Sequence, residues 1–475
     1  MSFMSSFVLT LPEVILSAGA IALMLVAAFA GDKAEGLCRW VAIALLAAAG
    51  MASFHHAGEA FDGLYRADDF SLYAKLLIYV AAAISLLLSP KFFSHEDRPR
   101  AEYPVLILLA TVGMGMMVSA VDLLTLYVGI ELNSLSAYVL ASFIRKDERA
   151  AEAGLKYFVL GALASGILLY GMSLLYGFSG TTHYAGLAKA MADGVNMGEL
   201  FGLVFVMAGL AFKISAVPFH MWTPDVYEGA PTPVTTFFAS APKVAGMAML
   251  ARMTTGALGP AAAQWQQILI FMALASVILG AVGAMGQTNI KRLLAYSSIN
   301  NVGFALVGLA AGTPDGVSAT MTYMAVYVVM TLGSFACVLH MRDANGHYVE
   351  DIASLAGLSR NNKALAAGFA ILMFSLAGIP PLLGFWPKLL VFFAATKAGL
   401  FPLAIIAALG SVVGAYYYLK IIKTMYFDDP APAYAPAHSY AESGVVAVSA
   451  VLLVGGYLLI PVLSAASAAA AGALF

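Results

Sequence analysis

The sequence has 475 residues, of which 61% are hydrophobic and 11% are charged, and its mean hydropathy is +0.88. Water-soluble chains carry about 45–50% apolar and about 25% charged residues, so this composition excludes a soluble protein. The formal net charge of −2 excludes the basic surface that a nucleic-acid-binding protein needs.

Long apolar runs dominate the chain. A bilayer core of about 30 Å needs about 20 apolar residues per helix. The sequence therefore predicts an all-α polytopic membrane protein with about fourteen transmembrane helices, numbered here as spans 1 to 14: 8–30, 38–56, 70–90, 103–120, 121–143, 154–177, 199–221, 233–255, 266–287, 292–312, 317–341, 364–396, 401–425 and 443–463. The first run lacks a basic leading segment and a cleavage site, which predicts a retained helix.

Span 12 is too long for one straight helix. It contains Pro380, Pro381 and Pro387, which lack backbone N–H donors, so we expect two half-helices there. The motif Phe212–Pro218 in span 7 resembles Phe374–Pro380 in span 12, each with Phe six residues before Pro. An offset of five spans reverses direction across the membrane, which favours two inverted five-helix repeats with broken helices 7 and 12, although two short runs could match by chance.

The repeats give a predicted division of the chain into four parts. Spans 1–3 occupy residues 1–102, and span 14 lies in residues 427–475. The first repeat, helices 4–8, occupies 103–256, and the second, helices 9–13, occupies 257–426. The longest polar stretches, 178–198, 342–363 and 426–442, are predicted to be connectors and not an extramembrane domain.

Positive charge is distributed unevenly among the connections. Fifteen Lys and Arg residues follow odd-numbered spans, whereas four follow even-numbered ones: Arg66, Lys189, Arg252 and Lys397. Short loops rich in Lys and Arg stay in the cytoplasm. The asymmetry predicts that the loops after odd-numbered spans face the cytoplasm and that both termini face the opposite side of the membrane.

Four charged residues lie near the middle of predicted spans: Glu131, Lys213, Lys243 and Lys388. Each costs about 2.5–3.5 kcal/mol on insertion scales, so a structural or functional role must account for its position in the membrane. A structural ion pair explains a single buried Lys beside a Glu about as well as a functional role does, but three lysines and one carboxylate leave lysines unpaired. Because low dielectric disfavours an unpaired ammonium, we predict that these lysines relay protons and that Glu131 modulates the nearest one, Lys213.

The sequence offers six weaker candidate relay residues: Lys156, His220, Tyr296, Ser298, Asn300 and Asn301. Snorkelling explains Lys156 equally well, because it lies near the cytoplasmic start of span 6. Ser and Asn side chains in span 10 could hold a file of water or serve as hydrogen bonds between helices. Asp225 and Glu228 are predicted to lie in a cytoplasmic loop, where helix capping or a subunit contact suffices to explain them.

Motifs for cofactors are missing from the sequence. There is no nucleotide-binding glycine loop, haem-attachment motif or nucleophile elbow. Cys38 and Cys337 are far apart, and the eight histidines have no metal-ligand spacing. We therefore expect no cofactor or metal in this chain and a driving force from an ion gradient or from attached subunits.

The stretch Ala211–Thr236, followed by Lys243, resembles the antiporter-like subunits of respiratory complex I, which are relatives of the multisubunit cation/proton antiporters. The resemblance covers about residues 103–425, including Glu131, Lys388 and Ala295–Ile299. Within this family, Asp225–Pro231 is most similar to the subunit N branch. Span 10 carries Asn300 and Asn301 where larger members of the family usually have a His, so the resemblance implies a lateral step that uses water held by these two residues.

The resemblance implies a proton-translocating membrane subunit of an NADH:quinone oxidoreductase in a bacterial inner membrane, with both termini on the periplasmic side. It implies that a proton reaches Lys213 from the cytoplasm, passes laterally through water and Lys243, and leaves by way of Lys388. NADH, FMN, iron–sulfur clusters and quinone would then belong to partner subunits, and other antiporter-like and small membrane subunits would be the partners. Two alternatives stay open: a subunit of a multisubunit cation/proton antiporter, and a non-transporting scaffold whose buried charges lock helices together.

Overall fold

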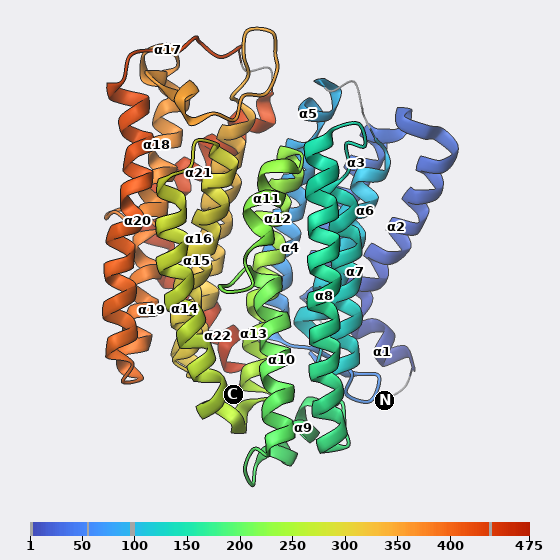
Figure 1. The fold of residues 1–475 in the computed structure, drawn as a ribbon. Coiled ribbons are helices and arrows are strands. Elements are labelled where there is room, and N and C mark those ends of the chain that lie inside the picture. Colours follow the sequence, from blue (N-terminus) through green and yellow to red (C-terminus); the bar gives the residue numbers. More distant parts are fainter. Residues whose placement is uncertain (1–2, 55–56, 96–99, 437–438) are drawn as a thin grey trace.

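The computed structural model describes residues 3–54, 57–95, 100–436 and 439–475, which form a bundle of long helices (Figure 1). Helices α5 and α17 lie at one end of the bundle, named here the α17 end. Helix α9 and both ends of the chain lie at the opposite end, named here the α9 end (Figure 1). Within the described ranges, twelve helical segments are long and apolar enough to cross a membrane.

The predicted all-α membrane architecture is confirmed, and the count of segments agrees with about fourteen spans. The first of the twelve segments, Leu11–Ser53, covers most of the first two predicted spans, and the predicted span 12 forms two shorter helices. One small β-hairpin was not predicted. Its strands pair in antiparallel register with Gly58 opposite Ala67.

The N-terminal part contains the helices that precede the first predicted repeat. Asp68 caps α4 by accepting a hydrogen bond from the Ser71 N–H at 2.8 Å. The elements are α1 (Phe3–Leu9), α2 (Leu11–Ala30), η1 (Gly31–Ala34), α3 (Glu35–Ser53), β1 (Gly58–Ala60), β2 (Tyr65–Ala67), α4 (Asp69–Leu88) and α5 (Pro90–His95).

The following part corresponds to the predicted residues 103–256. Asp122, Asp147 and Asn196 cap three of its helices through backbone N–H groups. The elements are α6 (Glu102–Ser119), α7 (Leu123–Ala141), α8 (Glu148–Ser179), α9 (Tyr184–Met191), α10 (Met197–Ile214), α11 (Trp222–Gly229), α12 (Thr232–Ala239) and α13 (Ala241–Thr255).

The remaining helices complete the bundle. Asn289, Thr313 and Asn362 cap the helices that follow them. The elements are η2 (Gly259–Ala261), α14 (Ala262–Met285), α15 (Ile290–Ala310), α16 (Pro314–Leu339), η3 (Ile352–Leu355), α17 (Leu358–Asn361), α18 (Lys363–Ala377), α19 (Phe385–Lys397), α20 (Phe401–Phe427), α21 (Tyr440–Gly455), η4 (Gly456–Leu459) and α22 (Ile460–Gly472).

Small residues let neighbouring helices approach closely. A Cβ on Gly113 of α6 would lie 2.6 Å from the Gly129 carbonyl oxygen of α7, and one on Gly171 of α8 would lie 2.8 Å from the Gly202 carbonyl of α10. Lipid tails are as apolar as the helices, so membrane helices associate through such close packing. These glycines set the spacing of the helices that carry the central charges.

The predicted interruptions of spans 7 and 12 are confirmed. Helix α10 ends at Ile214 and Ser215 adopts φ 63°, whereas α18 ends at Ala377 and Gly378 adopts φ 83°. Pro218 and Pro380 follow within three residues of these caps and prevent continuation of the helix. Pro387 does not break a helix, because it lies in the first turn of α19, where no intrahelical N–H bond is needed.

A third interruption was not predicted. Span 8 is divided at Ser240 into α12 and α13. Pro242 lies in the first turn of α13, and Ser240 has φ −113° and ψ −85°, outside the helical region. The division places Lys243 at the beginning of a half-helix.

Candidate functional site

Lys213 lies in the last turn of α10 and points towards α7. Its Nζ donates a 2.5 Å hydrogen bond to the Ser134 hydroxyl, which in turn donates to the Ile130 carbonyl at 2.5 Å. Glu131 lies one turn before Ser134 on α7, and its Oε1 is buried without a hydrogen-bond partner among the described residues. The predicted partners are therefore neighbours, but a hydroxyl holds the lysine instead of the carboxylate.

Lys243 is 1% exposed and is the third residue of α13. Its Nζ donates to the Ile214 carbonyl at 3.1 Å and to the Ser215 hydroxyl. The hydroxyl of Thr223 also donates to Ser215, at 2.6 Å. The lysine therefore binds the oxygen atoms that the interruption of α10 leaves free.

Lys388 is 6% exposed and is the fourth residue of α19. Its Nζ donates to the carbonyls of Leu376 and Ala377, each at 3.0 Å, and to the Ser411 hydroxyl at 3.2 Å. The Phe304 ring lies 4.7 Å from the ammonium, which is within cation–π range. The two carbonyls belong to the last turn of α18.

Lys243 and Lys388 have similar surroundings. Each ammonium starts from the first turn of a half-helix and meets the carbonyl end of an interrupted helix, which is α10 for Lys243 and α18 for Lys388. The partial negative charge of a helix C-terminus stabilises a cation there. In the part of the chain that the structure describes, neither these two lysines nor Lys213 forms an ion pair with a carboxylate.

The polar side chains of α15 bond to neighbouring helices. Ser298 accepts a hydrogen bond from the Tyr327 hydroxyl at 2.9 Å, and Asn301 accepts one from Tyr323 at 2.7 Å. Asn300 donates to the Val277 carbonyl of α14 at 2.7 Å. Tyr418 of α20 joins the group through Ser297, with 2.5 Å between the two hydroxyl oxygens. These are direct hydrogen bonds between helices, and they form a chain of hydroxyls and amides that joins α14, α15, α16 and α20.

Three further candidates lie outside these contacts. His220, between α10 and α11, is half-buried, and its Nδ1 is buried without a partner among the described residues. Tyr296 is half-buried against α14, where a Cβ on Gly283 would meet its ring at 2.5 Å. Lys156 pairs with Asp225 and with Glu152, each at 2.7 Å, so its charge is balanced at the protein surface.

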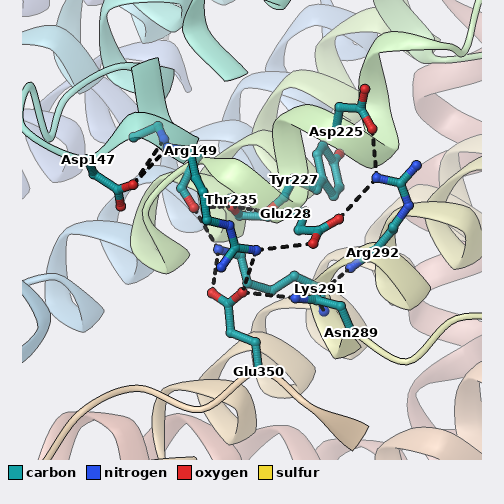
Figure 2. A network of polar contacts seen from close by, with 12 residues as sticks. Asp147, Arg149, Asp225, Tyr227, Glu228, Thr235, Asn289, Lys291, Arg292 and Glu350 are labelled. Carbon is teal, nitrogen blue, oxygen red and sulfur yellow. Dashed lines mark hydrogen bonds and ion pairs between the residues drawn. The ribbon is translucent and has the colours of Figure 1, made fainter. Parts of the chain in front are cut away.

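An ionic network at the α17 end connects the two halves of the chain (Figure 2). Arg292 of α15 pairs with Asp225 at 2.6 Å and with Glu228 at 3.0 Å. Arg149 bridges Glu228 and Glu350, and Lys291 pairs with Glu350 at 2.9 Å. Positive and negative groups alternate from α8 through α11 and α15 to the loop before α17. Asp225 and Glu228, which the sequence suggested as caps or subunit contacts, instead bind basic residues of the same chain.

The electrostatics of this network favour charged carboxylates. Burial raises the pKa of Glu350, but the Lys291 ammonium, its hydrogen bond and the Asn289 amide outweigh burial and hold the pKa below its usual value. Burial likewise raises the pKa of Asp225, and the hydrogen bonds from Lys156 and Arg292 lower it further than burial raises it. Both carboxyl groups therefore remain ionised at neutral pH.

Sequence reasoning missed several buried partners. Ser134, Ser215 and Ser411 hold the three central lysines, and Glu13 and Lys75 form a further buried ion pair at 2.6 Å. A signal existed for Ser134, because it follows Glu131 by three residues and therefore lies on the same helix face. Within the described ranges, no group of three or more His, Cys, Asp or Glu residues could hold a metal ion.

Known proteins share this architecture. Residues 120–414 match the family described as NADH:quinone oxidoreductase/Mrp antiporter, TM. A curated relative, NADH-quinone oxidoreductase subunit N of Rhizorhabdus wittichii, is 66% identical over 481 residues and is covered over 100% of both chains.

Solved structures resemble the chain over nearly its whole length. A chain of respiratory complex I from Thermus thermophilus has a TM-score of 0.82 and 32% identity, with 96% of this chain and 99% of that chain covered. A chain of the Mrp complex from Dietzia sp. has a TM-score of 0.81 at 22% identity, with 99% and 97% covered, and shows the fold alone.

Proposed function

Because the chain belongs to the subunit N family of NADH-quinone oxidoreductase and is a proton-translocating membrane subunit of that complex, we propose that Glu131, Lys213, Lys243 and Lys388 carry its protons. The observation that supports this most is the environment of the lysines. Hydroxyl and carbonyl oxygens hold their ammonium groups, and no carboxylate does so among the described residues. A lysine in an ion pair is held charged by its partner, whereas one on neutral oxygens can give up its proton.

The proposed order of transfer follows the chain of polar groups. A proton reaches Lys213, which lies beside Glu131 and Ser134, and passes to Lys243 through the interruption of α10, where Thr223 and Ser215 form hydrogen bonds. The hydroxyls and amides of α15 continue towards α16 and α20, and α20 supplies Ser411 to Lys388. Lys156, His220 and Tyr296 are proposed as side contributors only, because they lie outside these contacts.

The orientation and division of the chain belong to the same proposal. We place the α17 end in the cytoplasm, because the connections after odd-numbered spans carry most of the Lys and Arg residues, and the termini then lie in the periplasm. The matching interruptions after α10 and α18, in the fourth helix of each predicted repeat, support two five-helix repeats, residues 103–256 and 257–426. The partner subunits of the complex would include antiporter-like and small membrane subunits and would hold NADH, FMN, iron–sulfur clusters and quinone.

Replacement of each lysine in the whole complex tests the proposal. Lys213→Met, Lys243→Met and Lys388→Met are introduced into the chain in its native membrane, and the rate of NADH-driven proton pumping is measured per assembled complex in inverted vesicles. We expect each change to slow pumping by about a hundredfold or more, the usual scale for removal of a group that transfers a proton. Lys397→Met is the control, because Lys397 is exposed and pairs with Asp315 at the surface.

A scaffold role makes a different prediction. If the lysines only lock helices together, pumping falls in proportion to the amount of assembled complex and pumping per complex stays normal. That result, in all three variants, would contradict the proposal. Pumping that requires sodium without NADH would point to a cation/proton antiporter instead.

A further inference from the structure

A second cluster of buried ionisable groups lies at the α9 end, among α2, α4 and the hairpin. Lys75 of α4 pairs with Glu13 of α2 at 2.6 Å. The Tyr65 hydroxyl of β2 donates to Glu13 at 2.8 Å and accepts from Lys75 at 2.5 Å. The three residues are 2%, 7% and 4% exposed for Lys75, Glu13 and Tyr65, so three ionisable groups form a closed triangle away from water.

The surroundings of this triangle contain more polarity than an ion pair needs. The buried hydroxyl of Tyr79 lies near Glu13, and the buried hydroxyl of Ser119 lies beside Tyr65. Gly115 of α6 faces the carboxylate, and a Cβ there would lie 2.7 Å from Glu13 Oε1. A hydroxyl both donates and accepts hydrogen bonds, so these neighbours extend the set of groups between which a proton can pass.

A polar route connects the triangle with the surface at the α9 end. A small cavity of about 10 Å³, enough for about one water molecule, is lined by Lys75, Ser71 and Asp68. Asp68 binds Arg252 of α13 through two hydrogen bonds of 2.6 and 2.8 Å. Arg252 also lines an open cleft of about 390 Å³, together with Glu59, Arg66 and His183.

The inner end of this polar route lies on the same helix as one of the central charges. Arg252 follows Lys243 by nine residues on α13, a rise of about 13 Å along a helix axis. Tyr79 follows Lys75 by one turn of α4, towards the middle of the bundle. The triangle therefore lies between the interior and the cleft at the α9 end.

We propose that Glu13, Tyr65 and Lys75 form a further proton-transfer site through which this chain exchanges protons with the compartment at the α9 end. The inference rests on the proposed function, because it extends the path of the four central charges. A proton moves from Lys75 Nζ to Glu13 Oε1, so that an N–H bond breaks and an O–H bond forms, and the pair becomes neutral. The Tyr65 hydroxyl bridges both groups. A water molecule in the small cavity beside Lys75 then accepts the proton from the site or delivers a proton to the neutral Lys75.

A merely structural ion pair is the competing explanation. Replacing a buried pair by neutral side chains of similar size is often harmless, whereas removing one partner strands a buried charge. The two explanations therefore differ most in the double variant Glu13→Gln/Lys75→Met, which removes both charges together.

The test uses the whole complex in inverted vesicles and measures proton pumping per assembled complex and its solvent deuterium isotope effect. We expect Glu13→Gln to slow pumping about a hundredfold and to enlarge the isotope effect, and Glu13→Asp to recover part of the rate. The double variant should assemble and still pump slowly. Normal pumping in assembled Glu13→Gln, or recovery in the double variant, overturns the inference.

Two further variants keep the test decisive. If Glu13→Gln does not assemble, Tyr65→Phe removes a single oxygen and leaves the ion pair intact, and normal pumping in that variant also overturns the inference. Glu442→Gln is the matched control, because Glu442 forms another buried ion pair, with Arg342 at 2.6 Å near the α17 end, and should pump normally per complex.

Lys213→Met is measured in parallel and separates the two proposals. If Lys213→Met pumps normally, the proposed function fails and the inference fails with it. If Lys213→Met is slow and Glu13→Gln is normal, the inference alone fails.

Discussion

Gly378→Ala offers a way to move Lys388 without replacing it. Gly378 has φ 83°, and a Cβ there would lie 2.9 Å from Lys388 Cδ and 3.2 Å from Nζ. Because the lysine side chain is flexible and the backbone around it is packed, we expect the ammonium to move away from the carbonyls of α18. The variant therefore tests the contacts of the lysine and not its presence.

The expected magnitude follows from these contacts. An alanine in the left-handed region costs about 1–2 kcal/mol of folding free energy. Each hydrogen bond from a charged group contributes about 1.5–3 kcal/mol, so loss of one bond to Leu376 or Ala377 destabilises the charged lysine by that amount. A difference of 1.36 kcal/mol is tenfold in rate, so a step that charges Lys388 should slow by about ten- to a hundredfold.

Gly399→Ala is the matched control for this experiment. Gly399 has φ 79°, but a Cβ there would have nothing within 4 Å, so only the backbone cost applies. Both variants should show similar losses of thermal stability, whereas NADH-driven pumping per assembled complex, measured by fluorescence quenching in inverted vesicles, should fall only in Gly378→Ala. Equal pumping in the two variants would refute the assignment of Lys388 to the proton path.

Three other predictions concern residues away from the second interruption. Ser134→Ala removes the hydroxyl that holds Lys213 and should slow pumping about tenfold, whereas Ser136→Ala, which loses only a bond within its own helix, should pump normally; equal rates would count against the contact. The lowered pKa of Glu350 means that its ion pair stabilises the chain fully above the unfolded pKa of about 4.3, and that this stabilisation is lost as pH falls through the lower folded-state pKa. The difference in melting temperature between wild type and Glu350→Gln should therefore be constant from pH 7 to about 5 and should shrink as pH falls below the unfolded pKa, and a difference that does not shrink in acid would be inconsistent with this reasoning. Gly113→Ala should lower the melting temperature, because its Cβ would meet α7 backbone at 2.6 Å, whereas Gly166→Ala, with open space around it, should not; similar melting curves would disprove the packing role.

Much of the fold could be predicted from local features of the sequence. Apolar runs of about 20 residues identify the spans, and Pro218 and Pro380 identify two interruptions, because both signals act within a few residues of where they occur. The division at Ser240 escaped prediction, since Pro242 is compatible with the first turn of a helix as well as with its interruption.

The candidate site was less accessible to prediction. The charged residues could be identified because a charge within an apolar run is energetically costly. Their partners Ser134, Ser215 and Ser411 could not, because in the sequence they resemble the other serines of this chain. Their importance depends on which helices meet. Glu13 and Lys75 were missed because each lies near an end of a predicted span, where snorkelling usually explains a charge.

The backbone ligands of Lys388 also bear on how this site tolerates change over evolution. Two of its three hydrogen-bond acceptors are main-chain carbonyls, which every amino acid supplies. Sequence drift at Leu376 and Ala377 can alter the surrounding volume without deleting those acceptors. The site therefore depends on the path of the chain at the end of α18, and substitutions that preserve that path leave the ligands of the lysine in place.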